Sequence, residues 1–300
     1  MRSEVPQAFP YQGSKRLLAS KILPCIPRDT VRLVEPFAGS AAISVAAAFR
    51  QRAKSFLLND AHAPLAALWT QIIKDASGLA SGYEKIWNKQ LASPRQYYDQ
   101  IREQFNRTHE ADLFLFLLAR CVKAAIRYNS RGEFNNSPDK RRLGMKPETM
   151  RQNLVRIQAA FKGNVQVSSA DYSAVLSDCG KRDVVYMDPP YQGVCRDRDA
   201  RYVSGVRFDD FTAQLDHLNR RDIPFLVSYD GRTGNVSYGE RLPDELNLSH
   251  FEIKAGKSTQ STLLGKDEET FEALYLSPSL VKRLGKVPSC LTDREALLFH

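Results

Sequence analysis

Short apolar segments alternate with helical patterns along the first 73 residues. Val31 to Val34 is an apolar run followed by a turn, and the alanine-rich stretch Ala41 to Arg50 comes next. A second apolar segment, Ser55 to Leu58, precedes a helical pattern at Leu65 to Ile73. Apolar runs of this length bounded by turn residues are typical of buried strands, and alanine favours helix. The start of the chain therefore predicts a β-α-β-α unit.

From about residue 74 to residue 153 the pattern changes to long helical patterns without a convincing strand. One of them runs from Leu113 to Ile126, and we expect its apolar stripe Leu113 to Leu118 to form a local core. A connector rich in Gly, Asn, Pro, Lys and Arg follows. We interpret residues 74–153 as an inserted helical lobe, and residues 1–73 and 154–300 as one discontinuous domain.

Strand signals return after the lobe. They lie at Val165 to Ser168, Val184 to Met187 and Phe225 to Ser228, separated by helical stretches. His250 to Lys254 and Phe271 to Leu276 predict a closing β-hairpin. Alternating strands and helices predict an α/β fold with a mostly parallel sheet and helices on both faces. Ligands of such folds bind at the carboxyl ends of the strands.

The net charge of the chain is +9, with 43 basic and 34 acidic residues among 300. The excess is concentrated, because residues 120–156 contain ten Lys and Arg against three Asp and Glu. Phosphate binding with counterion release needs clustered cations of this kind. The charge distribution therefore favours a polyanionic partner at the inserted lobe.

Several other classes of protein are disfavoured. The five cysteines are scattered without a C-x-x-C pair, and the five histidines show no ligand spacing, so we expect neither a disulfide framework nor a metal site. The first residues lack the apolar run of a secretion signal, and no segment approaches the roughly eighteen apolar residues of a membrane span. We expect a cytoplasmic protein without a membrane partner.

The turn Phe37-Ala38-Gly39-Ser40 lies between the first predicted strand and the first predicted helix. Its glycine lets backbone N–H groups approach a bound nucleoside. Asp60 lies 21 residues beyond Gly39, at the end of the next predicted strand, where a carboxylate can accept hydrogen bonds from two ribose hydroxyls. Taken alone, these residues fit a tight turn with a solvated aspartate equally well.

The strongest chemical signal is Asp188-Pro189-Pro190-Tyr191, directly after the apolar strand. Two prolines cannot extend a strand and lack N–H donors, so they form a rigid corner whose carbonyl oxygens only accept hydrogen bonds. An aspartate and a proline carbonyl that accept both hydrogens of an aromatic amine would favour the tetrahedral geometry in which the nitrogen attacks a methyl group. Tyr191 would stack on a base removed from the helix. The alternative is a strand-terminating turn with an aromatic plug.

These motifs, in this order, resemble the Dam-like DNA adenine-N6 methyltransferases. The likeness spans roughly residues 9 to 280 and is loose outside the motifs. It is carried by Tyr11 to Lys15, Glu35 to Ser40, Asn59-Asp60, Arg127 to Asn135, Asp188 to Tyr191, Ser258 to Leu264 and Glu272 to Tyr275. The family implies a Rossmann-like methyltransferase sheet, with residues 1–73 and 154–300 as the catalytic domain and residues 74–153 as the target-recognition domain.

The resemblance implies S-adenosyl-L-methionine as the cofactor. The implied binding residues are Tyr11, Lys15, Glu35, Phe37, Ala38, Gly39, Ser40, Asp60, Asp171 and Tyr172. In the family, the aromatic residue and the lysine of the first motif line the cofactor and target-base pockets, and the acid equivalent to Asp171 lies beside the cofactor's adenine. The implied catalytic residues are Asp188, Pro189, Pro190 and Tyr191. This chain has Ala41 where relatives often have a second glycine, and we expect it to tighten the space beside the cofactor.

The resemblance also implies double-stranded DNA as the partner. The recognition segment lies in the basic region, and the implied DNA-binding residues are Arg127, Asn129, Arg131, Asn135, Lys140, Arg141 and Arg142. We expect Arg131 and Asn135 at base edges. A later loop carries Arg196, Arg198, Arg201 and Arg207. This loop fits either a clasp on the flipped strand's phosphates or a solvated loop of mixed charge.

The predicted reaction is metal-free methyl transfer to N6 of an adenine flipped out of DNA. The nearest alternative keeps the fold but changes the acceptor to N4 of cytosine, RNA or a protein side-chain amide, because similar Pro-Pro-Tyr corners serve all of these. A DNA-binding regulator with a decayed methyltransferase core is the other alternative. The sequence leaves open the recognition site, the choice between monomer and homodimer, and a cognate restriction enzyme. We expect a bacterial or phage-encoded protein associated with the nucleoid.

Overall fold

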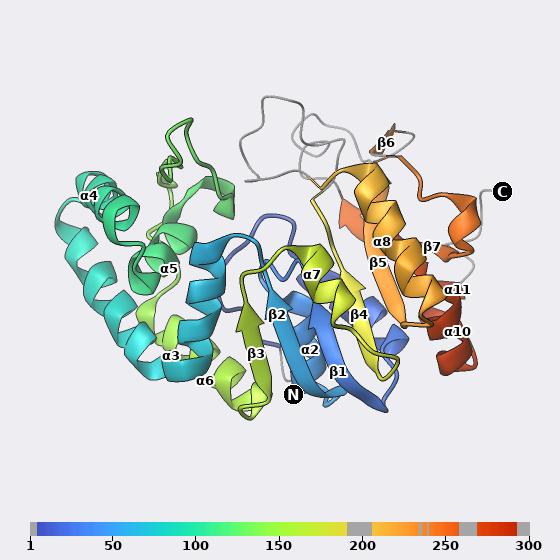
Figure 1. Ribbon diagram of the computed structural model, residues 1–300. Helices are drawn as coiled ribbons and strands as arrows, with labels where there is room; N and C mark the ends of the chain where they lie inside the picture. Colours follow the sequence, from blue (N-terminus) through green and yellow to red (C-terminus); the bar gives the residue numbers. More distant parts are fainter. Residues whose placement is uncertain (1–4, 191–205, 234–235, 239, 258–268, 293–300) are drawn as a thin grey trace.

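Five parallel strands form the centre of the molecule. The computed structural model describes residues 5–190, 206–233, 236–238, 240–257 and 269–292. Within them an eight-stranded sheet has the order β3-β2-β1-β4-β5-β8-β7, with β6 paired to β5 (Figure 1). The strands are β1 (Thr30–Glu35), β2 (Ala53–Asn59), β3 (Val165–Ser168), β4 (Asp183–Met187), β5 (Phe225–Thr233), β6 (Val236–Tyr238), β7 (Ser249–Lys257) and β8 (Glu269–Leu276). The first five pair in parallel and β7 pairs antiparallel with β8, which confirms the predicted sheet and hairpin.

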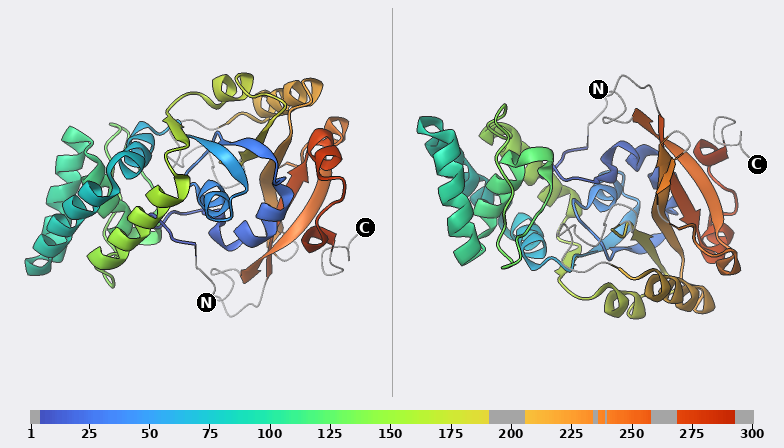
Figure 2. Two further views of the ribbon diagram at one scale, coloured as in Figure 1. Left: turned by 90° about the horizontal axis from the view of Figure 1, so that it is seen from below. Right: turned by 90° about the horizontal axis from the view of Figure 1, so that it is seen from above.

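Helices cover both faces of this sheet (Figure 2). The described α-helices are α1 (Ala19–Ile22), α2 (Ala42–Phe49), α3 (Ala63–Lys89), α4 (Pro94–Thr108), α5 (Ala111–Arg120), α6 (Pro147–Phe161), α7 (Tyr172–Ser177), α8 (Phe208–Arg220), α10 (Pro278–Leu284) and α11 (Ser289–Thr292). Val34 and Val185 belong to the apolar layer of α7 and α8, whereas Leu33 and Val184 belong to the layer of α1 and α2. Because both faces are covered, the central strands contain consecutive buried apolar residues, Leu33-Val34 in β1, Phe56 to Leu58 in β2 and Val184 to Met187 in β4. No helix among the described residues is long and apolar enough to cross a membrane.

The helical lobe lies beside the β3 edge of the sheet (Figure 1). Every residue from Leu113 to Leu118 is buried, as predicted, and the rings of Phe105, Phe114 and Phe134 lie 4.9 to 6.2 Å apart. The long helix α3 is interrupted at Asp75, where φ is −151° and ψ is 75°. Both α3 and α6 extend across a predicted domain boundary, so the division at residues 73/74 and 153/154 stays a prediction.

The helix expected from Leu113 to Ile126 ends earlier, at Arg120. Its extension was wrong because the chain folds back on itself: Val122 donates to the Ser137 carbonyl at 3.0 Å and Asp139 donates to the Arg120 carbonyl at 2.7 Å. The buried Arg120 guanidinium donates to Gln90 and to the carbonyl groups of residues 139 and 142. These contacts join residues far apart in the sequence and leave no periodic hydrophobic pattern, so the sequence did not indicate where the helix ends.

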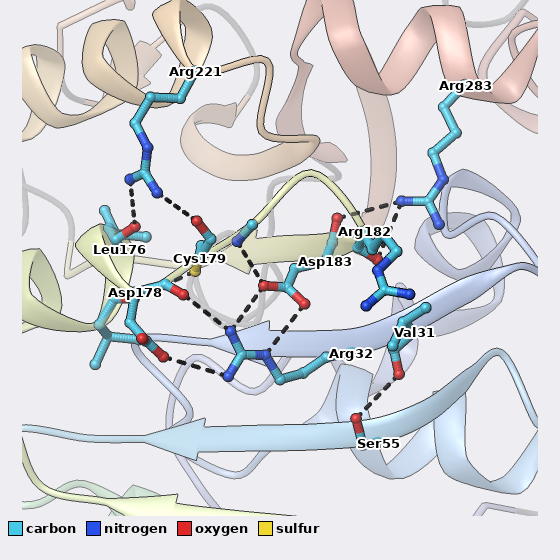
Figure 3. Close-up of polar contacts among 12 residues, drawn as sticks. Val31, Arg32, Ser55, Leu176, Asp178, Cys179, Arg182, Asp183, Arg221 and Arg283 are labelled. Carbon is cyan, nitrogen blue, oxygen red and sulfur yellow. Dashed lines mark hydrogen bonds and ion pairs between the residues drawn. The ribbon is translucent and has the colours of Figure 1, made fainter.

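A network of charged and backbone groups lies at the amino ends of β1 and β4 (Figure 3). Arg32 donates to both carboxylate oxygens of Asp183 at 3.2 and 2.8 Å, and to the Asp178 carbonyl at 3.2 Å. The Asp183 carboxylate also accepts from the Gly180 N–H at 2.8 Å. Arg221 donates to the Cys179 carbonyl at 2.5 Å. The network ties β1, β4 and the segment between α7 and β4 together, far from the carboxyl ends of the strands.

Candidate active site

The carboxyl ends of the parallel strands line a cavity of about 370 Å³. In Figure 1 these ends point upwards. The structure brings all the residues expected at the cofactor to this cavity: Tyr11, Lys15, Glu35, Phe37, Ala38, Gly39, Ser40, Asp60, Asp171 and Tyr172. Asp188, Pro189 and Pro190 line the same cavity, whereas Tyr191 lies outside the described residues. Segments spread over the whole chain therefore meet at the edge of the sheet where the fold predicts ligands.

The loop after β1 is fixed by contacts from three sides. Gly39 has a φ of 49°, and a Cβ atom there would lie 2.9 Å from the Tyr11 ring, so only glycine fits without strain. Its N–H donates to Asp60 Oδ2 at 2.9 Å. Its carbonyl accepts from the Trp69 indole of α3 at 2.9 Å. The loop is held in one shape by its neighbours, with its backbone at the cavity wall.

Ala41 does not have the predicted place beside the cofactor. Its side chain is fully buried in the core, and it is absent from the lining of the cavity. The residue instead adopts a left-handed conformation, with φ 45° and ψ 36°, immediately before α2. The missing second glycine therefore affects backbone strain and not the space of the cavity.

A buried carboxyl group, Glu35, and a half-buried one, Asp60, lie at the ends of β1 and β2. Glu35 Oε1 accepts from the Ser44 N–H at 3.3 Å, and Oε2 finds no hydrogen-bond partner among the described residues. Burial raises the pKa of Glu35 to about 8. Burial also raises the pKa of Asp60, although the N–H groups of His62 and Gly39 oppose this shift by donating to its carboxylate. Both groups keep hydrogen-bonding capacity for a ligand in the cavity.

Asp188 shares a cation with a second carboxylate. Lys15 Nζ lies 2.7 Å from Asp188 Oδ1 and 3.1 Å from Glu272 Oε1 on β8. Burial raises the pKa of Asp188 to about 6, Lys15 opposes this shift, and Glu272 adds to it. Burial lowers the pKa of Lys15, but the two carboxylates outweigh burial and leave it above its ordinary value. At neutral pH the site therefore contains an ionised acceptor at its centre.

Aromatic rings form the other side of the cavity. The Phe37 and Tyr172 ring centroids are 5.1 Å apart, and Phe37 also packs against Phe211 of α8. Asp171 caps α7 by accepting from the Ser173 N–H at 2.9 Å, and its side chain is exposed at the rim. Flat apolar rings next to an exposed carboxylate can hold a nucleobase with an exocyclic amine.

The predicted DNA-recognition segment forms a hairpin-like loop outside the cavity. Tyr128 and Phe134 pair as an isolated antiparallel bridge, and Asn135 donates to the Arg127 carbonyl at 2.8 Å. Arg131 lies at the exposed tip, with its guanidinium 2.8 Å from Glu133. Most of the predicted DNA-binding side chains are exposed and Asn129 is half-buried; the set is Arg127, Asn129, Arg131, Asn135, Lys140, Arg141 and Arg142. None of this set lines the described cavity.

Part of the positive charge of the basic region is used inside the protein. Arg120 is buried, Arg151 pairs with Glu84 at 2.8 Å, and the Arg156 guanidinium lies over the Phe49 ring. Charge counting along the sequence therefore overstates the cations that face a partner. The exposed cations of the loop after α5 remain as the basic surface. The backbone of this loop lies towards the carboxyl ends of the parallel strands (Figure 1).

The sequence matches known proteins over most of its length. Residues 11–280 match the family model of the D12 class N6 adenine-specific DNA methyltransferases. The chain belongs to this family. The predicted resemblance and the predicted enzyme class are thereby confirmed.

Individual relatives of this methyltransferase come from bacteria and a phage. It is 27% identical over 235 residues to a DNA N-6-adenine-methyltransferase of Escherichia phage P1, covering 74% of this chain and 29% of the phage protein. It is 29% identical to the retron Ec67 DNA adenine methylase of Escherichia coli over 257 residues, which are 83% of each chain. It is 22% identical to the type II methyltransferase M.FokI of Planomicrobium okeanokoites over 290 residues, covering 91% of this chain and 43% of that protein. The chain thus spans less than half of the length of two of these relatives.

Several cavity residues of this D12-class chain were not predicted. His62 lines the cavity, and its Nε2 lies 2.5 Å from the Tyr128 hydroxyl of the recognition segment. Its position two residues after Asp60 was the available signal. Glu272 is not among the lining residues but contacts Lys15, which is. It belongs to the family-like segment Glu272 to Tyr275, but nothing in that segment indicated a contact with Lys15, which depends on the place of β8 in the sheet. Of the four arginines predicted in the loop after Tyr191, Arg207 lines the cavity near Asp210, and Arg196, Arg198 and Arg201 lie outside the described residues.

Proposed function

We propose that this methyltransferase transfers a methyl group from S-adenosyl-L-methionine to N6 of an adenine swung out of double-stranded DNA. The observation that carries the proposal is the shared cavity. The Asp188-Pro189-Pro190 corner, whose carboxylate and carbonyl groups accept hydrogen bonds, opens into the same space as the Gly39 loop and Asp60. An acceptor corner and a nucleoside site in one cavity suit transfer between two bound molecules.

The residues around the cavity fit the proposed cofactor. Asp60 would hold the ribose hydroxyls, and Phe37, Tyr172 and Asp171 would hold the adenine. The buried Oε2 of Glu35, which has no partner among the described residues, suits a cationic amino group. When bound, the cofactor supplies a methyl group on a positively charged sulfur.

The chemical contribution of the chain is orientation of the target amine. The Asp188 carboxylate and the Pro189 carbonyl would accept its two hydrogens and direct the nitrogen lone pair at the methyl group. Asp188 must be ionised for this role, so activity falls as the pH drops below about 6, the pKa set chiefly by its burial. Tyr191 would stack on the flipped base.

The exposed loop after α5 would hold the DNA. Its backbone turn presents Arg131 at the tip, and the neighbouring Lys140, Arg141 and Arg142 are exposed cations suited to phosphates. We assign base contacts to Arg131 and Asn135. Since one relative is named a type II methyltransferase, a cognate restriction enzyme is a further proposal, as are a homodimer and a cytoplasmic location at the nucleoid.

Replacement of Asp188 tests the proposed chemistry. D188A should lower methyl incorporation into DNA by about a thousandfold while cofactor binding persists, because an acceptor that acts on the transition state is lost. The measurement uses labelled cofactor, followed by nucleoside digestion and mass analysis. D222A, at an exposed aspartate paired with Lys181, is the matched control and should retain activity. Label in N4-methylcytosine, or undiminished label from D188A, would refute the proposal.

Replacement of Arg131 tests the proposed recognition segment. R131A should weaken binding to the methylated sequence about tenfold and relax discrimination at one base pair, since a base contact is worth ~1–3 kcal/mol. The sites methylated by the wild-type chain are first mapped by sequencing, and a duplex with that sequence is used for titration. R220A, an exposed arginine on α8, serves as the control. Equal affinity and equal base preference in R131A would remove this residue from the interface.

A further inference from the structure

Three charged side chains from distant parts of the chain meet at the cavity. Lys15 is the last residue of the first motif, Asp188 follows β4, and Glu272 lies within β8. The Lys15 ammonium is 2.7 Å from Asp188 Oδ1 and 3.1 Å from Glu272 Oε1. The side chains of Lys15, Asp188 and Glu272 are 8%, 20% and 14% exposed, respectively. One buried ammonium therefore lies within ion-pair distance of two carboxylates that are themselves mostly shielded from solvent.

The position of Glu272 is set firmly by the sheet. Its backbone pairs with Gly231 of β5 and with Ile253 of β7. A Cβ atom at Gly231 would lie 2.7 Å from the Phe271 carbonyl oxygen, so the strands approach closely at this point. The register of β5 and β8 also shifts between Tyr229 and Gly231. A bulge of this kind commonly redirects a side chain next to a functional site.

The proposed role of Asp188 creates a conflict with Lys15. Asp188 must accept a hydrogen of the target amine, but the ammonium already occupies one of its oxygens. A buried ammonium that leaves one carboxylate needs another one nearby, because an unpaired buried charge costs several kcal/mol. Glu272 supplies that second carboxylate within hydrogen-bond distance of the same nitrogen.

We propose that Glu272 is a positioning residue that receives the Lys15 ammonium when the target amine binds to Asp188. The inference rests on the proposed role of Asp188 as the amine acceptor. In the empty site Lys15 bridges the two carboxylates and keeps Asp188 ionised. In the loaded site Lys15 pairs with Glu272, and the Asp188 oxygens face the amine.

The charges around Asp188 determine the expected pH behaviour. Lys15 lowers the pKa of Asp188, whereas Glu272 raises it. Within the described part of the chain, two further titratable groups interact with Asp188: Glu35 of β1 and Tyr186 of β4. The Tyr186 hydroxyl donates to Ser228 at 3.1 Å. Removing the Glu272 charge should therefore move the acid limb of the rate profile to lower pH, and removing the Lys15 charge should move it to higher pH.

The experiment compares E272Q, K15M and the double variant with the wild-type protein. The rate of methyl transfer to a short duplex is measured from pH 5 to 9 at saturating S-adenosylmethionine. E272Q should move the acid limb of kcat/KM down by about one pH unit, since a like charge near a carboxylate shifts its pKa by about that amount. K15M should move the limb up, and the double variant should return it towards the wild-type position.

A second readout separates positioning from DNA binding. E272Q should lower kcat at pH 8 about tenfold, because Lys15 then remains on Asp188, whereas the Kd for DNA should change less than about twofold. E272D, which keeps the charge, should restore most of kcat. E252Q is the matched control: Glu252 lies on the neighbouring strand β7 and pairs with Arg232 at 2.8 Å. The E252Q variant should keep the acid limb at the wild-type pH and the wild-type kcat.

The outcomes distinguish this inference from the proposed function. Activity in D188A would overturn both. An inactive D188A together with an E272Q variant that has the wild-type limb and kcat would overturn the role of Glu272 alone. A shift of the acid limb in E252Q as large as that in E272Q would also overturn the role of Glu272, because loss of any nearby carboxylate would then have this effect. If E272Q alone does not fold, the double variant, which lacks both charges, is compared with K15M. An acid limb at the same pH in these two variants would contradict the inference.

Discussion

The two ends of strand β4 use aspartate in opposite ways. At its amino end, Asp183 receives two hydrogen bonds from Arg32 and one from the Gly180 N–H. Just beyond its carboxyl end, Asp188 shares one ammonium with Glu272, and burial raises its pKa to about 6. The first carboxylate is fully engaged within the protein. The second retains acceptor capacity for a molecule from outside.

The aspartate at one end of β4 therefore contributes to stability, and the aspartate beyond the other end is available for chemistry. A carboxylate with a bidentate arginine and a backbone donor stabilises the fold, and its loss leaves an uncompensated charge. A buried carboxylate with incomplete compensation destabilises the fold, and such groups are typical of functional sites. The amino end of the sheet therefore holds the layers together, while the carboxyl end bears an energetic cost for function.

The largest expected effect contrasts these two aspartates directly. D183N should lower the free energy of unfolding by about 3 kcal/mol, because Arg32 loses its bidentate partner and keeps only the exposed Asp178 carboxylate at 3.5 Å. D188N should leave it unchanged or raise it, because Lys15 keeps Glu272 and one poorly compensated charge is removed. Urea titration at pH 7.5 measures both values. A D188N variant destabilised as strongly as D183N would break the comparison.

A smaller effect is expected at Glu35, also at the carboxyl end. Burial raises its pKa to about 8, above the value of about 4.3 for an unfolded chain. The folded state therefore binds the extra proton, and Glu35 makes the protein less stable as the pH rises through this window. Without cofactor, E35Q should have the same melting temperature as the wild type at pH 4.5 and a higher melting temperature at pH 8.5. The replacement E245Q, at an exposed glutamate, serves as the control. Melting curves of E35Q and the wild type that run parallel with pH would contradict the assignment.

The smallest expected effect concerns the backbone before α2. A47G should cost about 2 kcal/mol, because a buried methyl group and helix propensity are both lost. A41G should stay within about 0.5 kcal/mol of the wild type, since relief of the left-handed conformation offsets the lost methyl group. Comparing the thermal unfolding of the two variants isolates the contribution of the left-handed conformation at residue 41 to stability. Equal losses at both positions would show that Ala41 carries no strain.

The sequence predicted the carboxyl end of the sheet much better than the amino end. The motifs that end at Ser40, Asp60 and Tyr191 each follow a strand directly, so each can be recognised from a few consecutive residues. The Arg32–Asp183 pair joins residues 151 positions apart and leaves no comparable pattern. Glu272 was missed as a partner of Lys15 for the same reason. Contacts set by tertiary packing are visible only once the strands are in register.

The interruption of α3 has a consequence for exchanging DNA specificity between relatives. Asp75 accepts from the Gly78 N–H at 2.8 Å, so the second half of α3 begins with its own cap. The first half carries Trp69, which holds the Gly39 carbonyl. A lobe grafted from another D12 protein at the Asp75 interruption would bring its own N-cap residue for the second half of the helix. The indole that fixes the Gly39 loop would stay with its original half. Under the proposed roles of the lobe and the cavity, such a chimera would change its target sequence without rebuilding the cavity.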